Sequence, residues 1–133
     1  MKKEVQTVTS LLKYKNKILL LKRSQRVGFY AGKWAGVSGF LEEGEIPEER
    51  AKIEIFEETG LKGKILKKGK VIKVFDKELN ANVVIHLFLF EVKKQKVKLN
   101  WEHDDYVWIK PEEINKYDTV PILNRIFKIL LKN

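Results

Sequence analysis

With 133 residues, 44% of them apolar and 34% charged, the chain is long enough to bury one hydrophobic core, and we expect a single domain over residues 1–133. The absence of cysteine excludes disulfides, thiolate metal sites and cysteine nucleophiles, and no apolar run is long enough to span a membrane. The net charge of +9 would suit a nucleic-acid partner, but the lysines are spread along the whole chain, so nucleic acid is not expected and stays an open alternative.

The first third of the chain predicts strands joined by turns, because alternating or apolar runs are separated by Lys-Asn and by glycines. The expected strands cover residues 4–14, 17–21 and 34–39. A helix is predicted next. Pro47 suits its first turn, where the missing N–H costs nothing, and Gly60 is expected to end it.

The second half predicts a central strand with further strands and a helix around it. Residues 82–92 are apolar at both alternating sets of positions, which is typical of a strand in the middle of a sheet that helices cover on both sides. The other expected elements are a strand or bent pair of strands at 64–75, a strand at 105–110, a helical turn near 111 and a helix at 120–132. The fold class is therefore α/β (α+β), a mixed sheet sandwiched between helices.

Negative charge is concentrated in one segment of this basic chain. Residues 39–61 hold eight acids and two bases, although the whole chain has 27 Lys+Arg against 18 Asp+Glu. On the predicted helix Glu54, Glu57 and Glu58 share one face. We expect apolar side chains on two sides of that face, Ile55 and Ile53 among them, to anchor the helix.

Three carboxylates on one rigid helical face suit a hard divalent cation. Mg²⁺ takes a few carboxylate oxygens and completes its octahedron with water and substrate phosphates. The alternative interpretation is an ordinary solvated acidic face, since like charges at this spacing cost only about 0.2–0.5 kcal/mol per exposed pair.

The spacing in this segment resembles the box of the Nudix (MutT-like) hydrolase family. Eight of the nine defined box positions match, and the ninth, where the family has Arg, is Ile53. The matching residues are Gly39, Glu45, Glu54, Ile55, Glu57, Glu58, Gly60 and Leu61. The resemblance extends to ILLLKRS at residues 18–24, GKWAGVSG at 32–39 and WEHDDYVWIKPEEI at 101–114.

The resemblance implies a Mg²⁺-dependent hydrolase, with Mn²⁺ as an alternative ion, in which water attacks a phosphorus of a nucleoside diphosphate linked to another group. It implies that Glu54, Glu57 and Glu58 are catalytic metal ligands and that the Gly39 carbonyl is an additional ligand. For the general base it leaves two candidates, Glu54 and Glu102.

Two further residues are expected to support the site. The resemblance implies that Glu45 stabilises the turn and the helix. In the family the box Arg helps to hold the catalytic Glu, and Ile53 cannot do so. Our hypothesis is that Arg50, four residues before Glu54 on the same helix, partly replaces that contact. The loss of the box Arg also keeps open a non-catalytic nucleotide- or RNA-binding module.

The range of candidate substrates is narrowed by two marker residues that the chain lacks. Residues 74–76 carry neither the Pro nor the Tyr that mark the family's ADP-ribose and dinucleoside polyphosphate hydrolases, although both activities stay open. The compact chain thus resembles the nucleoside triphosphate pyrophosphohydrolases that remove unwanted nucleotides. Arg23 and Lys33 are the expected phosphate contacts and Phe75 is a candidate for base stacking.

The sequence also predicts the cellular location and the partners of the protein. The N-terminal residues lack the apolar core of a signal peptide, so a cytoplasmic location and no membrane partner are expected. Many relatives are dimers, so a homodimer stays open.

Overall fold

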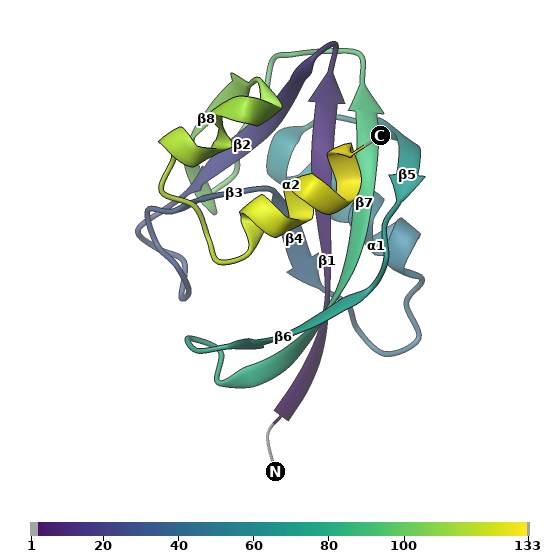
Figure 1. Ribbon diagram of the computed structural model, residues 1–133, viewed down its shortest axis with the longest axis vertical. Coiled ribbons are helices and arrows are strands. Elements are labelled where there is room, and N and C mark those ends of the chain that lie inside the picture. The colour runs from purple at the N-terminus through teal and green to yellow at the C-terminus, as the bar shows by residue number, and fades with distance from the viewer. Residues whose placement is uncertain (1–2, 133) are drawn as a thin grey trace.

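A parallel pair of long strands forms the centre of the sheet. In the computed structural model, which describes residues 3–132, β1 (Lys3–Tyr14) and β7 (Ala81–Val92) lie side by side from the pair Lys3–Ala81 to the pair Lys13–Glu91. Both strands cross the whole molecule in Figure 1. The sequence prediction of a central strand at 82–92, apolar on both faces, is confirmed.

The remaining strands are added to this pair. Four lie on the β1 side: β2 (Lys17–Arg23) and β4 (Val37–Phe40) pair with β1, and β3 (Trp34–Ala35) pairs with β2. β8 (His103–Ile109) also pairs with β2. On the other side β5 (Gly63–Lys68) and β6 (Ile72–Asp76) both pair with β7. The segment 64–75, expected to be a strand or a bent pair of strands, thus forms two strands.

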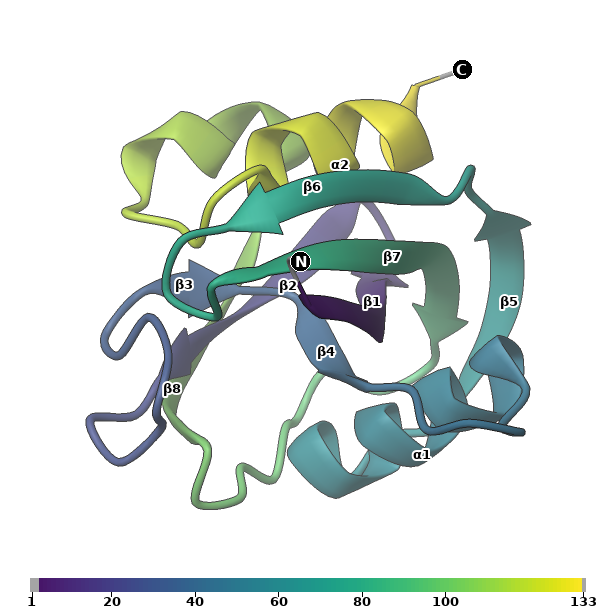
Figure 2. The same ribbon diagram turned by 90° about the horizontal axis from the view of Figure 1, so that it is seen from below.

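Helices cover both faces of the sheet. Figure 2 shows α1 (Pro47–Thr59) on one face and α2 (Leu123–Leu131) on the other, with the short 3₁₀ helix η1 (Pro111–Lys116) beside α2. One hydrophobic cluster lies between α2 and the sheet and a second lies under α1. The predicted mixed sheet sandwiched between helices is confirmed. Within residues 3–132, no helix combines the length and the apolarity that a bilayer crossing needs.

The last helix begins later than the sequence predicts. A helix was expected from residue 120, but α2 starts at Leu123. The backbone of Val120 instead donates a hydrogen bond to the Trp34 carbonyl at 2.9 Å, and Trp34 donates to the Asp118 carbonyl at 2.9 Å. A proline follows at position 121, which disfavours the helical conformation at Val120. The segment before α2 is therefore extended along β3.

The strand expected at 34–39 is interrupted at Gly36. A Cβ at this position would lie 2.9 Å from the Ser10 carbonyl oxygen. Only glycine allows the chain to pass so close to β1, and the break there separates β3 from β4.

The apolar side chains of α1 are not all buried, contrary to the prediction that they anchor the helix on two sides. Ile55 is 0% exposed and packs under the helix, whereas Ile53 is 43% and Phe56 56% exposed. The helix is therefore anchored along one side only, and Ile53 does not contribute to the anchoring.

This division predicts unequal effects for two similar substitutions. Ile55→Ala should lower the free energy of unfolding by about 2–5 kcal/mol, because it leaves a cavity in the core. Ile53→Ala, on the exposed side of the same helix, should change it by less than about 0.5 kcal/mol. Urea denaturation of both variants measures the difference, and equal losses would show that α1 packs differently.

Candidate active site

A cleft of about 880 Å³ contains most of the residues that the sequence singles out. Residues of β2, β4, α1 and the loop before β8 contribute part of its lining, and they include Arg23, Gly39, Arg50, Glu54 and Glu102. Its apolar lining comes from β6, β7 and the start of α2. The cleft thus joins charged groups suited to phosphates with an apolar wall suited to a planar base.

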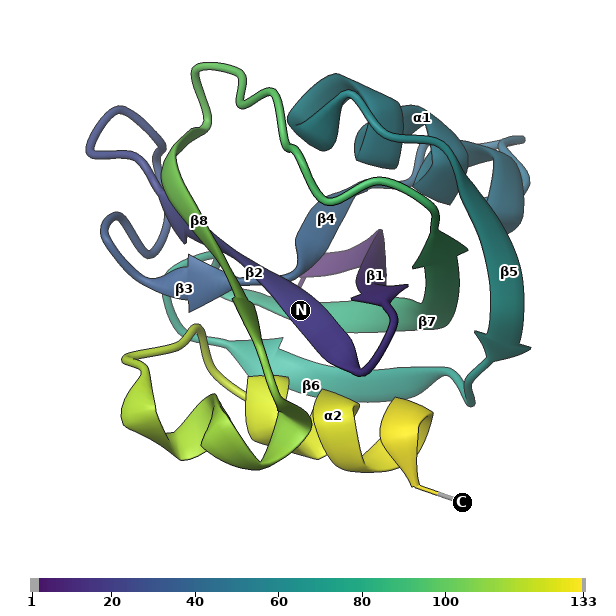
Figure 3. The same ribbon diagram turned by 90° about the horizontal axis from the view of Figure 1, so that it is seen from above.

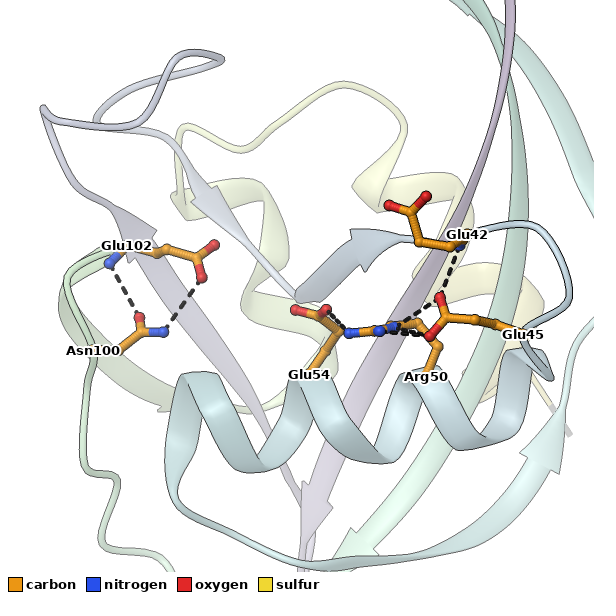
Figure 4. Close-up of polar contacts among 6 residues, drawn as sticks. All are labelled: Glu42, Glu45, Arg50, Glu54, Asn100 and Glu102. Atoms are coloured by element: carbon orange, nitrogen blue, oxygen red, sulfur yellow. Dashed lines mark hydrogen bonds and ion pairs between the residues drawn. The ribbon is translucent and has the colours of Figure 1, made fainter.

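Arg50 connects two acids of the predicted box. Its Nε donates to both carboxylate oxygens of Glu45 at 3.1 Å, and its Nη1 donates to Glu54 Oε2 at 3.0 Å (Figure 4). Glu45 also accepts a hydrogen bond from the backbone N–H of Glu42 at 2.8 Å. The guanidinium therefore ties the acidic turn to the helix and fixes the Glu54 carboxylate.

These contacts shift the pKa values of both partners. The hydrogen bond from Arg50 lowers the pKa of Glu45, and the same pair raises the pKa of Arg50. Both groups therefore remain charged, and the network persists as an ion pair across the ordinary pH range.

Gly39 lets the backbone of β4 approach Glu54 closely. A Cβ at position 39 would lie 2.7 Å from the Cγ of Glu54, far inside van der Waals contact. The glycine thus leaves room for the carboxylate that Arg50 holds from the other side. The structure brings together three residues of the predicted site, Gly39, Arg50 and Glu54.

Glu58 is buried beside them, and one of its two carboxylate oxygens lacks a hydrogen bond among residues 3–132. Its side chain is 1% exposed, and its Oε2 has no hydrogen bond in the described part of the chain. Burial raises its pKa well above the ordinary value, and the neighbouring Glu102 and Glu54 add to the rise. His103 Nε2 lies 3.8 Å from Glu58 Oε1, but burial lowers the pKa of His103 to about 4, so the ring is neutral near pH 7.

Glu102 reaches the site from the segment between β7 and β8. This segment passes beside α1 in Figure 3, where the backbone of Lys98 donates to the Thr59 carbonyl at 2.9 Å. The Asn100 side chain orients Glu102 by accepting from its N–H at 3.1 Å and donating to its Oε1 at 3.3 Å. Burial raises the pKa of Glu102, with Glu54 and Glu57 contributing. Glu57 itself is exposed.

The carboxylates suit metal binding through one or two protein ligands better than binding in a complete protein cage. Within residues 3–132 no three His, Asp or Glu side chains are arranged as a ready-made metal cage. Mg²⁺ rarely needs one, because it binds through one or two carboxylates and takes the rest from water and substrate phosphates. The unpaired buried oxygen of Glu58, with Glu54 nearby, suits this second mode.

The three predicted substrate contacts lie in different surroundings. Arg23 lines the cleft, and its Nε donates to the Phe29 carbonyl at 2.8 Å. Phe75 also lines the cleft and is 43% exposed. Lys33 does not belong to the described lining, and its Nζ forms an ion pair with Asp118 at 2.9 Å.

One feature of the cleft was not predicted, a link across it made by Tyr30. The Tyr30 hydroxyl donates to Asp76 Oδ1 at 2.9 Å, and its backbone N–H donates to Glu78 Oε1 at 3.0 Å. The loop at 24–33 is thus joined to the turn between β6 and β7. The partners are 46 and 48 residues apart, so no local sequence signal could have indicated them.

Comparison with known proteins identifies the family to which the chain belongs. The NUDIX domain model matches residues 3–128 of the chain. The chain belongs to the Nudix hydrolase family. It is 30% identical over 120 residues to the nucleoside triphosphatase NudI of Klebsiella pneumoniae, a match that covers 84% of this chain and 85% of that protein.

Solved structures agree with this assignment. The MutT protein from Methanosarcina mazei Go1 superimposes with a TM-score of 0.82 at 28% identity, over 95% of this chain and 91% of that one. An Ap4A hydrolase from Caenorhabditis elegans shares the fold alone, with a TM-score of 0.77, 18% identity and 93% coverage of both chains. The protein is therefore a Nudix hydrolase, of a family that generally uses a divalent metal ion.

The network around Arg50 predicts an effect on this hydrolase. In Arg50→Ala, Glu54 loses its bound guanidinium, and we expect the hydrolytic rate to fall about 10- to 100-fold, as is typical when a residue that orients a ligand is removed. Lys52→Ala, an exposed cation on the same helix, is the matched control and should keep the wild-type rate.

A rescue variant distinguishes loss of the contact that positions Glu54 from loss of folding. Ile53→Arg, made in the Arg50→Ala background, restores the family's own arginine and should recover part of the rate. Equal rates for Arg50→Ala and Lys52→Ala would contradict a positioning role for Arg50.

Proposed function

We propose that this Nudix hydrolase is a Mg²⁺-dependent pyrophosphohydrolase of nucleoside triphosphates, acting in the cytoplasm as a single domain over residues 1–133. The observation that carries the proposal is the unpaired, buried Glu58 oxygen beside Glu54, which Arg50 fixes at a cleft that also contains Arg23. The choice of triphosphates is supported by the NudI relative, which is named a nucleoside triphosphatase.

The acids of α1 are assigned to the metal ion. Glu54 and Glu58 would hold it, with Glu57 at the exposed side and the Gly39 carbonyl as an additional ligand, and Mn²⁺ could take the place of Mg²⁺. When bound, such an ion polarises phosphoryl oxygens and lowers the pKa of bound water.

Other residues of the chain bind the substrate and move the proton. Arg23 supplies a fixed positive charge to a phosphate, because the Phe29 carbonyl holds its Nε. Phe75 packs against the base at the apolar side of the cleft. Glu102, oriented by Asn100, takes the proton from the attacking water, with Glu54 as the alternative base. Lys33 would have to leave Asp118 to reach a phosphate, so we give it a minor role.

A substrate panel tests this proposal. The protein is incubated with nucleoside triphosphates, ADP-ribose, dinucleoside polyphosphates and capped RNA, each with Mg²⁺, with Mn²⁺ or with EDTA. We expect pyrophosphate from the triphosphates with either metal and none with EDTA. Triphosphates left intact while ADP-ribose or a dinucleoside polyphosphate is split would overturn the substrate assignment.

A pair of variants then tests the metal ligands. Glu58→Gln should lower the triphosphate rate by at least about 10-fold, because a neutral amide binds Mg²⁺ more weakly than a carboxylate does and the ion polarises the phosphoryl group. Glu49→Gln removes the same charge from an exposed position of α1 and should leave the rate unchanged. A Glu58→Gln variant as active as Glu49→Gln would show that Glu58 holds no catalytic ion.

A further inference from the structure

Basic side chains that are scattered in the sequence are gathered around one groove in the structure. The groove has a volume of about 560 Å³ and lies between the β5–β6 connection and the outer side of α2. Six of its eight lining residues are cationic and none is acidic. The cations are Lys67, Lys68, Lys70, Arg125, Lys128 and Lys132. We define this set as the basic groove.

Helix α2 forms one wall of the basic groove, because its apolar side chains face the sheet and its cationic side chains face solvent. Leu123, Ile126, Phe127 and Leu130 are buried against the sheet. Arg125 and Lys128 recur at i and i+3 on the opposite, solvent side, and Lys132 follows directly after the helix ends. At about 1.5 Å of rise per residue, Arg125 and Lys128 lie about 4–5 Å apart along the helix axis.

The end of β5 and the β5–β6 connection form the other wall and are held on α2. A Cβ on Gly69 would lie 2.9 Å from Leu130 Cδ2, and the Gly69 N–H donates to the Leu87 carbonyl at 2.8 Å. Lys67 Nζ donates to the Ile129 carbonyl near the end of α2 at 2.9 Å. Figures 2 and 3 show the connection beside the C-terminal end of α2. The two rows of cations are therefore fixed side by side.

Most of these cations are not neutralised by the protein itself. Lys68 forms an ion pair with Glu48 at 3.0 Å, and Lys67 is bonded to a helix carbonyl. No other side chain among residues 3–132 forms an ion pair or hydrogen bond with Lys70, Arg125, Lys128 or Lys132. Four free cations around one recess create a positive potential that attracts a polyanion.

We propose that the basic groove binds the phosphodiester backbone of duplex nucleic acid without regard to base sequence. Duplex DNA carries one negative charge per about 1.7 Å of its axis, and cations that contact its phosphates release the counterions condensed on it. Proteins that bind single strands add aromatic side chains for base stacking, and the lining of the groove contains none. The groove shares no lining residue with the cleft, so binding there leaves the hydrolytic site open.

Fluorescence anisotropy with a labelled duplex of mixed sequence tests the proposal, read between about 50 mM and 200 mM salt. Four contacting cations predict a slope of log affinity against log salt of about −3 to −4. Arg125→Glu/Lys128→Glu should weaken binding at least about 10-fold and make the slope shallower by about 2. If this double variant does not fold, Lys70→Glu on the β5–β6 connection replaces it.

A charge-matched control variant distinguishes an effect of the basic groove from an effect of the protein's net charge. Lys93→Glu/Lys94→Glu changes two exposed lysines outside the groove by the same amount and should bind nearly as well as the wild type. Both double variants should retain the wild-type melting temperature. Equal loss of affinity in the two double variants, no binding by the wild type at low salt, or tighter binding of a single strand or of inorganic polyphosphate than of the duplex would overturn the proposal.

Discussion

The bridge that Arg50 makes between Glu45 and Glu54 is the interaction on which the candidate active site depends. Eight acids in a short segment of a basic protein would repel one another if each turned freely to solvent. One guanidinium, bonded to the turn and to the helix at once, gives the first part of that segment a fixed geometry. Because Gly39 has no side chain, the Glu54 carboxylate can lie between this guanidinium and β4. The acid that the resemblance assigns to the metal is therefore held in place by the protein's own residues.

The rest of the fold brings distant groups to this bridge. The parallel pair of β1 and β7 carries β4 on one side and supports α1 through the cluster that contains Ile55. The long segment after β7 then passes beside α1, which places Glu102 and His103 near Glu58. A buried carboxylate oxygen without a hydrogen bond, such as Glu58 Oε2, is costly unless the group is paired or coordinates a metal ion. The burial of this oxygen therefore supports a metal-binding role for Glu58.

Local patterns predicted the elements well, and contacts between distant residues account for most of what they missed. Pro47, Gly60 and the box spacing predicted α1 closely, since a helix depends on residues near in sequence. The start of α2 was predicted too early because Pro121 disfavours a helical conformation at Val120 and because Val120 pairs with the distant Trp34. The same reason explains the ion pair of Lys33 with Asp118 and the link from Tyr30 to Asp76. The hypothesis for Arg50 succeeded in placing its contact with Glu54 because i, i+4 neighbours meet on any helix.

The central claim is that Glu54 and Glu58 together bind a divalent ion at the cleft. Isothermal titration of the wild-type protein with Mn²⁺, beside a nucleotide analogue that resists hydrolysis, measures this uptake without relying on catalysis. The account predicts saturable binding that weakens at least about 10-fold in Glu54→Gln and Glu58→Gln. No uptake by the wild type, or the same affinity in both variants as in the wild type, would contradict it.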